Sequence, residues 1–261
     1  MISYLVLGVI SGILAGSLGL GGGVVVVPAL VSIFRLQGFT PDITMHMALA
    51  TSLATIVMTS ASSAYAHHRK NAISWTLAAT LVVGIVPGAF GGSLLASLLP
   101  GGVLQPTFGL FALIVAWRMW KGRMPVARKA VPTPGVVGWV SGGTAIGMIS
   151  SVVGIGGGSI TVPLLLRYGI DMRQAVATSS VCGFAIATAG VSGYLVSSIH
   201  LEGLPDNHLG YIYLPAFAGI TLASLLTAPL GVSLAHRLPV KVLKSMFAAV
   251  MALIGIKMIL L

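Results

Sequence analysis

Two glycine clusters are the residues of this chain best suited to binding chemistry. The first reads GLGGG over 19–23, the second reads GIGGG over 154–158, and Pro28 and Pro163 follow them at equal spacing. Both clusters lie in apolar segments, where glycines break a helix and free backbone N–H and C=O groups. The first N–H groups of a resuming helix lack intrahelical partners, and the helix dipole places about +0.5 charge there. Because glycine has no side chain to block approach, the pattern predicts an anion site built from backbone.

Hydroxyl side chains near the clusters are candidate donors to an oxyanion. We expect helices to resume at Val24 and Ser159, and Thr161 lies two residues beyond Ser159. Each half then carries an Ala-Thr-Ser triplet. The predicted binding residues are Gly21, Gly22, Gly23, Val24, Thr51, Ser52, Gly156, Gly157, Gly158, Ser159, Thr178 and Ser179. Two alternatives stay open at this point. The glycines can serve close helix packing, and Ser and Thr can bond back to their own helix.

The two clusters belong to two similar halves of the chain. The similarity extends beyond the clusters: a string ending at Pro100 matches one ending at Pro239, and Phe108 matches Phe247. We therefore expect one membrane repeat over 1–120 and a second over 135–261. A basic, proline-rich linker over 121–134 joins them.

Composition places the chain in the membrane. Of its 261 residues 56% are hydrophobic and only 7% are charged, against about 25% charged in soluble domains. We expect an all-α, polytopic membrane protein with full spans at 47–66, 73–99, 103–120, 174–199, 211–235 and 240–260. The net charge of +10 comes from basic residues scattered through short loops, which argues against nucleic-acid binding. The single cysteine, Cys182, excludes a disulfide framework within one chain.

The distribution of Lys and Arg decides how the two glycine-broken segments, 2–34 and 135–168, lie in the membrane. If each segment crosses once, the basic residues divide eight against six between the two sides. If each is a hairpin that returns to its own side, they divide twelve against two, with Arg35 and Lys257 alone on one side. The second division is the positive-inside pattern. We therefore expect inverted repeats, six full spans plus two broken hairpins, a cytoplasmic linker and both termini outside the cytoplasm.

The acidic residues argue against coupling by an intramembrane carboxylate. Asp42, Asp171, Glu202 and Asp206 all fall in expected loops, whereas ion-coupled carriers keep acids within the membrane. With the cytoplasm negative, moving one negative charge outward releases about 2.3 kcal/mol per 100 mV. This favours uncoupled export of an anion. A proton-coupled permease remains the alternative, with His46 as its titrating group.

Once both glycine motifs are placed, the chain resembles the sulfite exporter TauE/SafE family of membrane permeases over nearly its whole length. The resemblance assigns the motif positions to Gly19, Gly21, Gly22, Gly23 and Pro28, and to Gly154, Gly156, Gly157, Gly158 and Pro163. It implies a transporter, not an enzyme, that moves small sulfur-containing anions such as sulfite or organosulfonates across the bacterial inner membrane. The expected partners are that anion and the lipid bilayer, and a homodimer with a second copy of the chain is a further expectation. We expect no nucleic acid, no cofactor, no metal and no catalytic residue.

Two other interpretations remain open from the residues. The glycine clusters of a non-transporting assembly or accessory subunit would serve packing alone. The string Gly190-Val191-Ser192-Gly193 matches the GxSG string of rhomboid-type intramembrane proteases, but such an enzyme also needs a histidine base facing the serine.

Overall fold

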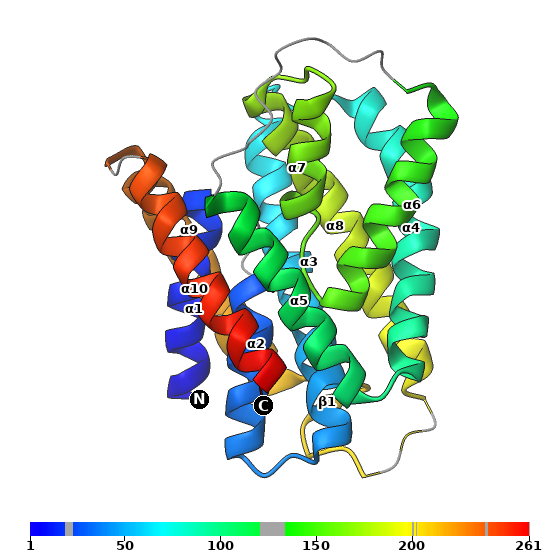
Figure 1. Cartoon of the computed structure of the whole chain (residues 1–261), viewed down its shortest axis with the longest axis vertical. Coiled ribbons are helices and arrows are strands. Elements are labelled where there is room, and N and C mark those ends of the chain that lie inside the picture. Colours follow the sequence, from blue (N-terminus) through cyan, green and yellow to red (C-terminus); the bar gives the residue numbers. More distant parts are fainter. Residues whose placement is uncertain (19–22, 121–133, 200, 202, 238–239, 261) are drawn as a thin grey trace.

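The computed structural model describes all residues except 19–22, 121–133, 200, 202, 238–239 and 261. The described residues form ten helices and one short hairpin of strands (Figure 1). The elements are α1 (Ile2–Leu18), α2 (Gly23–Leu36), α3 (Pro41–His68), α4 (Trp75–Leu98), α5 (Gly101–Trp120), α6 (Val136–Val153), α7 (Gly158–Arg167), α8 (Met172–Ser197), β1 (His208–Leu209), β2 (Ile212–Tyr213), α9 (Leu214–Arg237) and α10 (Val240–Leu260). The predicted all-α membrane class is confirmed.

Local sequence signals explain where several helices begin and end. Thr40 precedes Pro41, a proline at the first helical position, where its missing N–H costs nothing. The Asp171 carboxylate caps α8 by accepting the backbone N–H of Arg173 at 3.0 Å. Helix α6 ends at Gly154, whose φ of +69° is left-handed and whose N–H reaches the Ser150 and Ser151 carbonyls. The end of α6 is therefore set by Gly154, the first glycine of the second cluster.

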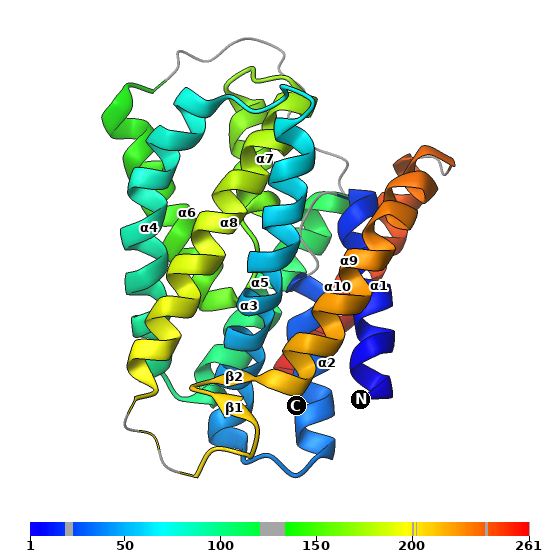
Figure 2. The same ribbon diagram turned by 180° about the vertical axis from the view of Figure 1, so that it is seen from behind.

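Both glycine-broken segments form hairpins. Helix α1 runs from the end of the molecule that holds both chain termini past its middle, and α2 returns to that end (Figure 1). Helix α6 enters from the opposite end, and α7 turns back towards it (Figures 1 and 2). Each helix of α1–α5 points opposite to its counterpart in α6–α10, so the halves are inverted as predicted. The resuming helices begin at Gly23 and Gly158, each one residue earlier than expected.

The two halves interleave. Helix α1 packs along α9, and its counterpart α6 packs along α4, while α3 packs on α8 and α5 on α10. Glycines permit this close packing. A methyl group added at Gly8 would lie 2.7 Å from the Ile220 carbonyl oxygen, and one added at Gly92 would lie 2.7 Å from the Met148 carbonyl oxygen. Gly8 and Gly92 therefore serve close helix packing.

Length and composition identify four helices able to cross a membrane within the described part of the chain: α3, α4, α6 and α8. Shorter apolar stretches that include α2, α7 and parts of α1, α9 and α10 accompany them. Helix directions place the basic residues with described side chains at two ends. Arg69, Lys70, Arg118, Arg167 and Arg173 lie towards the end where α3 and α7 finish, whereas Arg35 and Lys257 lie towards the end with the termini. The predicted linker, 121–134, falls almost entirely outside the described residues.

Candidate functional site

The two glycine clusters meet in the interior of the molecule. A methyl group added at Gly23 would lie 3.0 Å from the Gly154 carbonyl oxygen and 3.0 Å from Ser52 Oγ. The Ser52 hydroxyl itself donates a hydrogen bond of 2.9 Å to that carbonyl. Gly23 and Val24 are buried in the first turn of α2, while Gly21 and Gly22 lie outside the described residues. The inverted hairpins therefore bring their broken ends together, as the charge pattern and glycine spacing predicted.

The start of α7 carries hydrogen-bonding groups that lack partners. Gly157 occupies the N-cap position, and no side chain caps the first N–H groups of the helix. Ser159 Oγ and Thr161 Oγ1 are buried atoms with no hydrogen-bond partner among the described residues. The Thr161 oxygen lies 3.1 Å from the position that a Cβ on Gly157 would take, so this hydroxyl faces the N-cap. An unpaired buried hydroxyl costs about 1–3 kcal/mol, which a ligand at this place would recover.

Neighbouring helices complete the surroundings of Gly157. A methyl group on Gly157 would collide with Ile186 Cδ1 of α8 and would lie 3.9 Å from the backbone nitrogen of Gly183. A methyl group on Gly183 would in turn lie 3.2 Å from Ser60 Oγ of α3. Gly183 and Ser60 were not among the predicted site residues. A single glycine or serine within a long apolar helix gives no local signal, and only the crossing of α3, α7 and α8 brings them to the site.

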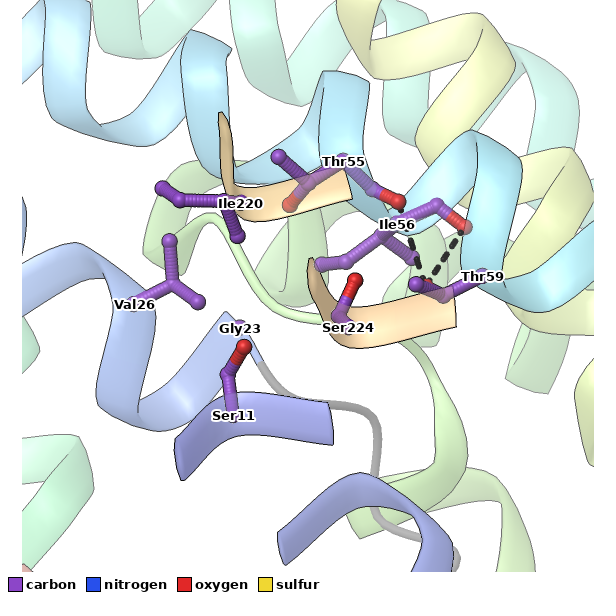
Figure 3. A pocket seen from close by; sticks show the side chains of 8 residues that line it. All are labelled: Ser11, Gly23, Val26, Thr55, Ile56, Thr59, Ile220 and Ser224. Carbon is purple, nitrogen blue, oxygen red and sulfur yellow. Dashed lines mark hydrogen bonds between the residues drawn. The ribbon is translucent and has the colours of Figure 1, made fainter. Parts of the chain in front are cut away.

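The first cluster faces a different environment. A cavity of about 10 Å³ lies beside Gly23, lined in part by Ser11 of α1, Thr59 of α3 and Ser224 of α9 (Figure 3). This volume is about enough for one water molecule and too small for a sulfur oxyanion. Each of these hydroxyls donates to a carbonyl of its own helix: Ser11 to Gly8, Thr59 to Thr55 and Ile56, and Ser224 to Thr221. The two clusters therefore differ: among the described residues around them, the unpaired hydroxyls Ser159 and Thr161 belong to the second.

Although Gly23 meets Gly154, the side chain of Ile56 lies between Gly23 and Gly156. Its Cδ1 lies 2.6 Å from the position of a Cβ on Gly23, and its Cγ2 lies 3.3 Å from that of a Cβ on Gly156. Ile56 belongs to α3, is only 2% exposed, and follows the Ala-Thr-Ser triplet by one turn. Ile56 is thus an apolar wedge between the N-terminal regions of α2 and α7.

The predicted threonine and serine donors already have partners in this structure. Thr51 Oγ1 accepts the backbone N–H of Tyr213 at 3.0 Å, just before α9. Its counterpart Thr178 accepts the N–H of Ser74 at 3.2 Å, just before α4. These two equivalent bonds tie each half to the start of a helix in the other half. Their role as anion ligands stays a prediction, and the observed role is structural.

The serines of the two triplets are also engaged within the protein. Ser52 bonds to Gly154, as described above, whereas Ser179 donates to the Val176 carbonyl of its own helix at 2.8 Å. The alternative that triplet hydroxyls bond back to their helix therefore holds for Ser179. Among the predicted hydroxyl residues, Ser159 remains the one whose buried oxygen lacks a partner in the described part of the chain.

His46, the candidate for proton coupling, is fixed by backbone carbonyls. Its Nδ1 lies 2.9 Å from the Asp42 carbonyl oxygen, and its Nε2 lies 3.0 Å from that of Leu99. The ring also stacks on Tyr211, with ring centroids 5.2 Å apart. Since both nitrogens face protein acceptors, the ring has a structural role that joins α3 to the end of α4.

The serine of the GxSG string shows no nucleophile geometry. Ser192 Oγ donates to the Thr188 carbonyl at 2.9 Å on an exposed face of α8. Gly193 packs against α4, where an added methyl would lie 2.9 Å from the Phe90 carbonyl oxygen. His208 Nδ1 lies 3.1 Å from the Gly210 carbonyl oxygen in the loop before β2. The string is therefore explained by helix packing.

Comparisons with known proteins agree with this architecture. The family model described as "Sulfite exporter TauE/SafE" matches residues 4–258. A probable membrane transporter protein of Haemophilus influenzae is 37% identical over 98% of this chain and 97% of its own length. Probable membrane transporter proteins of Methanocaldococcus jannaschii and Bacillus subtilis are 27% and 25% identical over 98% and 97% of this chain, covering 94% and 95% of their own lengths. No solved structure matches the chain.

Proposed function

Since this chain belongs to the sulfite exporter TauE/SafE family, whose members similar to it are named probable membrane transporters, we propose that it exports small sulfur-containing anions such as sulfite or organosulfonates. The anion binds at the glycine-broken ends of the two hairpins, near the middle of the membrane. The observation that carries this proposal is a pair of buried hydroxyls at the N-terminus of α7, Ser159 and Thr161, which have no hydrogen-bond partner among the described residues.

The start of α7 supplies what an oxyanion requires. The first backbone N–H groups and the Thr161 hydroxyl lie where the helix dipole is positive, the Ser159 hydroxyl belongs to the same turn, and Gly157 and Gly183 remove side-chain bulk. Hydroxyl and amide donors stabilise an oxyanion by hydrogen bonds, so the site needs no buried cation, whose desolvation would be costly. The α2 side, with its hydroxyls already engaged, contributes mainly its helix N-terminus. We therefore assign the principal contacts to the second cluster.

Transport is uncoupled from protons in this proposal. Asp42 lies in the first turn of α3, Asp171 caps α8, and Asp206 lies in the loop before β1, so these carboxylates are outside the interior. The excess of basic residues supports an orientation in which the end where α3 and α7 finish faces the cytoplasm, across an inner membrane. A singly charged anion leaving a negative cytoplasm then gains about 2.3 kcal/mol per 100 mV, and a doubly charged one gains twice that.

The small cavity and the Ile56 wedge describe a closed state in this proposal. A cavity of about 10 Å³ holds no oxyanion, so transport requires the wedge to move relative to the glycine clusters. The cross-half bonds of Thr51 and Thr178 connect such a movement to the starts of α9 and α4.

Flux in proteoliposomes tests the proposal. We expect saturable movement of sulfite, sulfoacetate or thiosulfate that accelerates under an imposed potential and is indifferent to a proton gradient. Chloride serves as the control anion. Proton-dependent flux would contradict the uncoupled mechanism and return attention to His46. Correctly folded protein that moves none of these anions would support the accessory-subunit interpretation.

A further inference from the structure

Two basic side chains lie together at the opposite end of α2 from its glycine cluster. Fourteen basic residues occur in the chain, and Arg35 and Lys257 are the only two that the hairpin topology assigns to the end with the termini. They are 222 positions apart in sequence, yet both line one hollow of about 290 Å³ between α2, α5 and α10. This volume is many times that of the cavity at the glycine clusters.

Neutral side chains hold both cations in place. The Arg35 guanidinium donates to Gln105 Oε1 at 2.6 Å, and the amide nitrogen of Gln105 donates to the Met258 carbonyl at 3.0 Å. Gln105 is 7% exposed, so its amide is a fixed, buried support for the arginine. On the other wall, Lys257 Nζ donates to Ser32 Oγ at 3.1 Å. Both positive charges thus face the hollow while bound to uncharged partners.

Arg35 and Lys257 carry more N–H donors than their observed hydrogen bonds to the protein use. A guanidinium carries five N–H donors and an ammonium carries three. The observed bonds to Gln105 and Ser32 use one donor of each cation. Arg35 and Lys257 are also exposed, so a ligand can reach them from outside. The ends of α2 and α10 carry only partial negative charge, about half a unit each, which leaves the pair net positive.

We propose that the hollow formed by Arg35, Gln105, Lys257 and Ser32, the outer cation pocket, binds an oxyanion of the phosphate or sulfonate type. Arginine supplies a planar fork of donors to two oxygens, and lysine supplies a point charge to a third. The ligand is either a free oxyanion or the phosphate of an anionic lipid, since both present the same group. This inference does not rest on transport, because it concerns binding at residues far along α2 from the glycines.

Binding measurements on purified protein test the outer cation pocket. Thermal stability in detergent is followed while sodium sulfate or phosphatidylglycerol is added, with sodium chloride as the ionic-strength control. We expect the apparent affinity for at least one probe to fall about tenfold or more in Arg35→Gln/Lys257→Gln, because charge-assisted hydrogen bonds are lost. The matched control, Lys70→Gln/Arg118→Gln, removes the same charge from the other end and should bind like the wild type.

A variant that keeps both positive charges distinguishes loss of the binding site from a folding defect. Arg35→Lys/Lys257→Arg keeps both cations in the hollow and should retain binding within a few-fold of the wild type. An effect of sulfate in lipid-free protein assigns a free oxyanion as ligand, whereas an effect of phosphatidylglycerol alone assigns a lipid.

Two results would overturn the proposal. The first is wild-type affinity for both probes in the double glutamine variant. The second is loss of binding in Gly157→Ala with full binding in Arg35→Gln/Lys257→Gln, which would place the only anion site at the glycine clusters. If the protein moves no anion but still binds a probe in a way that depends on Arg35, the proposed transport is contradicted. The outer cation pocket is then still supported.

Discussion

Replacing Gly157 by alanine separates binding from packing at the start of α7. The backbone of Gly157 is right-handed, with φ −58° and ψ −12°, so alanine adopts it without strain. The new methyl would meet Ile186 Cδ1 and would lie 3.1 Å from Thr161 Oγ1. Both atoms are at the ends of side chains that can shift, so we expect a cost of about 1–3 kcal/mol from overpacking. The protein should therefore fold.

Flux should fall much more than stability. The methyl occupies the space in front of the Thr161 hydroxyl and the first N–H groups of α7. Each hydrogen bond to a charged ligand contributes about 1.5–3 kcal/mol, so the loss of one or two reduces transport by roughly tenfold to several hundredfold. The assay is anion flux per folded protein in proteoliposomes, with folded yield measured by size-exclusion chromatography and thermal unfolding.

A compensating substitution sharpens the test. Ile186→Val removes the Cδ1 atom that the new methyl meets, at a cost of about 0.5–1.5 kcal/mol when made alone. The double variant Gly157→Ala/Ile186→Val should regain stability and remain inactive. Recovery of flux together with stability would refute the reasoning, because it would show that Gly157 serves packing alone. Gly91→Ala is the matched control, since an added methyl there meets nothing within 4 Å and should leave fold and flux unchanged.

Three further experiments test other parts of the structure. Thr51→Val and Thr178→Val should each cost about 1–3 kcal/mol in thermal unfolding by stranding a backbone N–H, and serine at either position should restore it; unequal recovery would contradict their equivalence. Ile56→Ala should lower stability by about 2–5 kcal/mol and raise flux per folded protein, whereas an unchanged rate would show that the wedge does not limit passage. In a cysteine-free background, an impermeant maleimide added to intact cells should label Leu209→Cys but not Lys70→Cys, and the reverse would invert the proposed orientation.

Much of the fold was predictable because its signals are local or additive. Low charge and long apolar runs indicate membrane helices wherever they occur, and a glycine at positive φ, such as Gly154, ends a helix from its own position. The division of basic residues favoured hairpins over single crossings, and the structure shows hairpins. Membership of the TauE/SafE family was also visible from the paired glycine motifs.

The roles of individual hydroxyls were not predictable in the same way. Thr51 and Ser159 are both small polar residues near a glycine cluster, yet Thr51 accepts an N–H from the other half while Ser159 Oγ is buried without a partner among the described residues. Which of these occurs depends on the neighbour that the fold supplies. Sequence spacing places a hydroxyl on a helix but says nothing of the donor or acceptor that faces it.

The sequence by itself therefore determined the class of protein, the two inverted halves and the places where the helices break. The tertiary structure alone decided that Gly23 meets Gly154 and that Ile56 lies between Gly23 and Gly156. It also decided that Arg35 and Lys257 line the same hollow. The first set follows from hydrophobic transfer, backbone sterics and the charge bias of membrane insertion, which act on each segment separately. The second set follows from how the helices of two halves cross, which no single segment encodes.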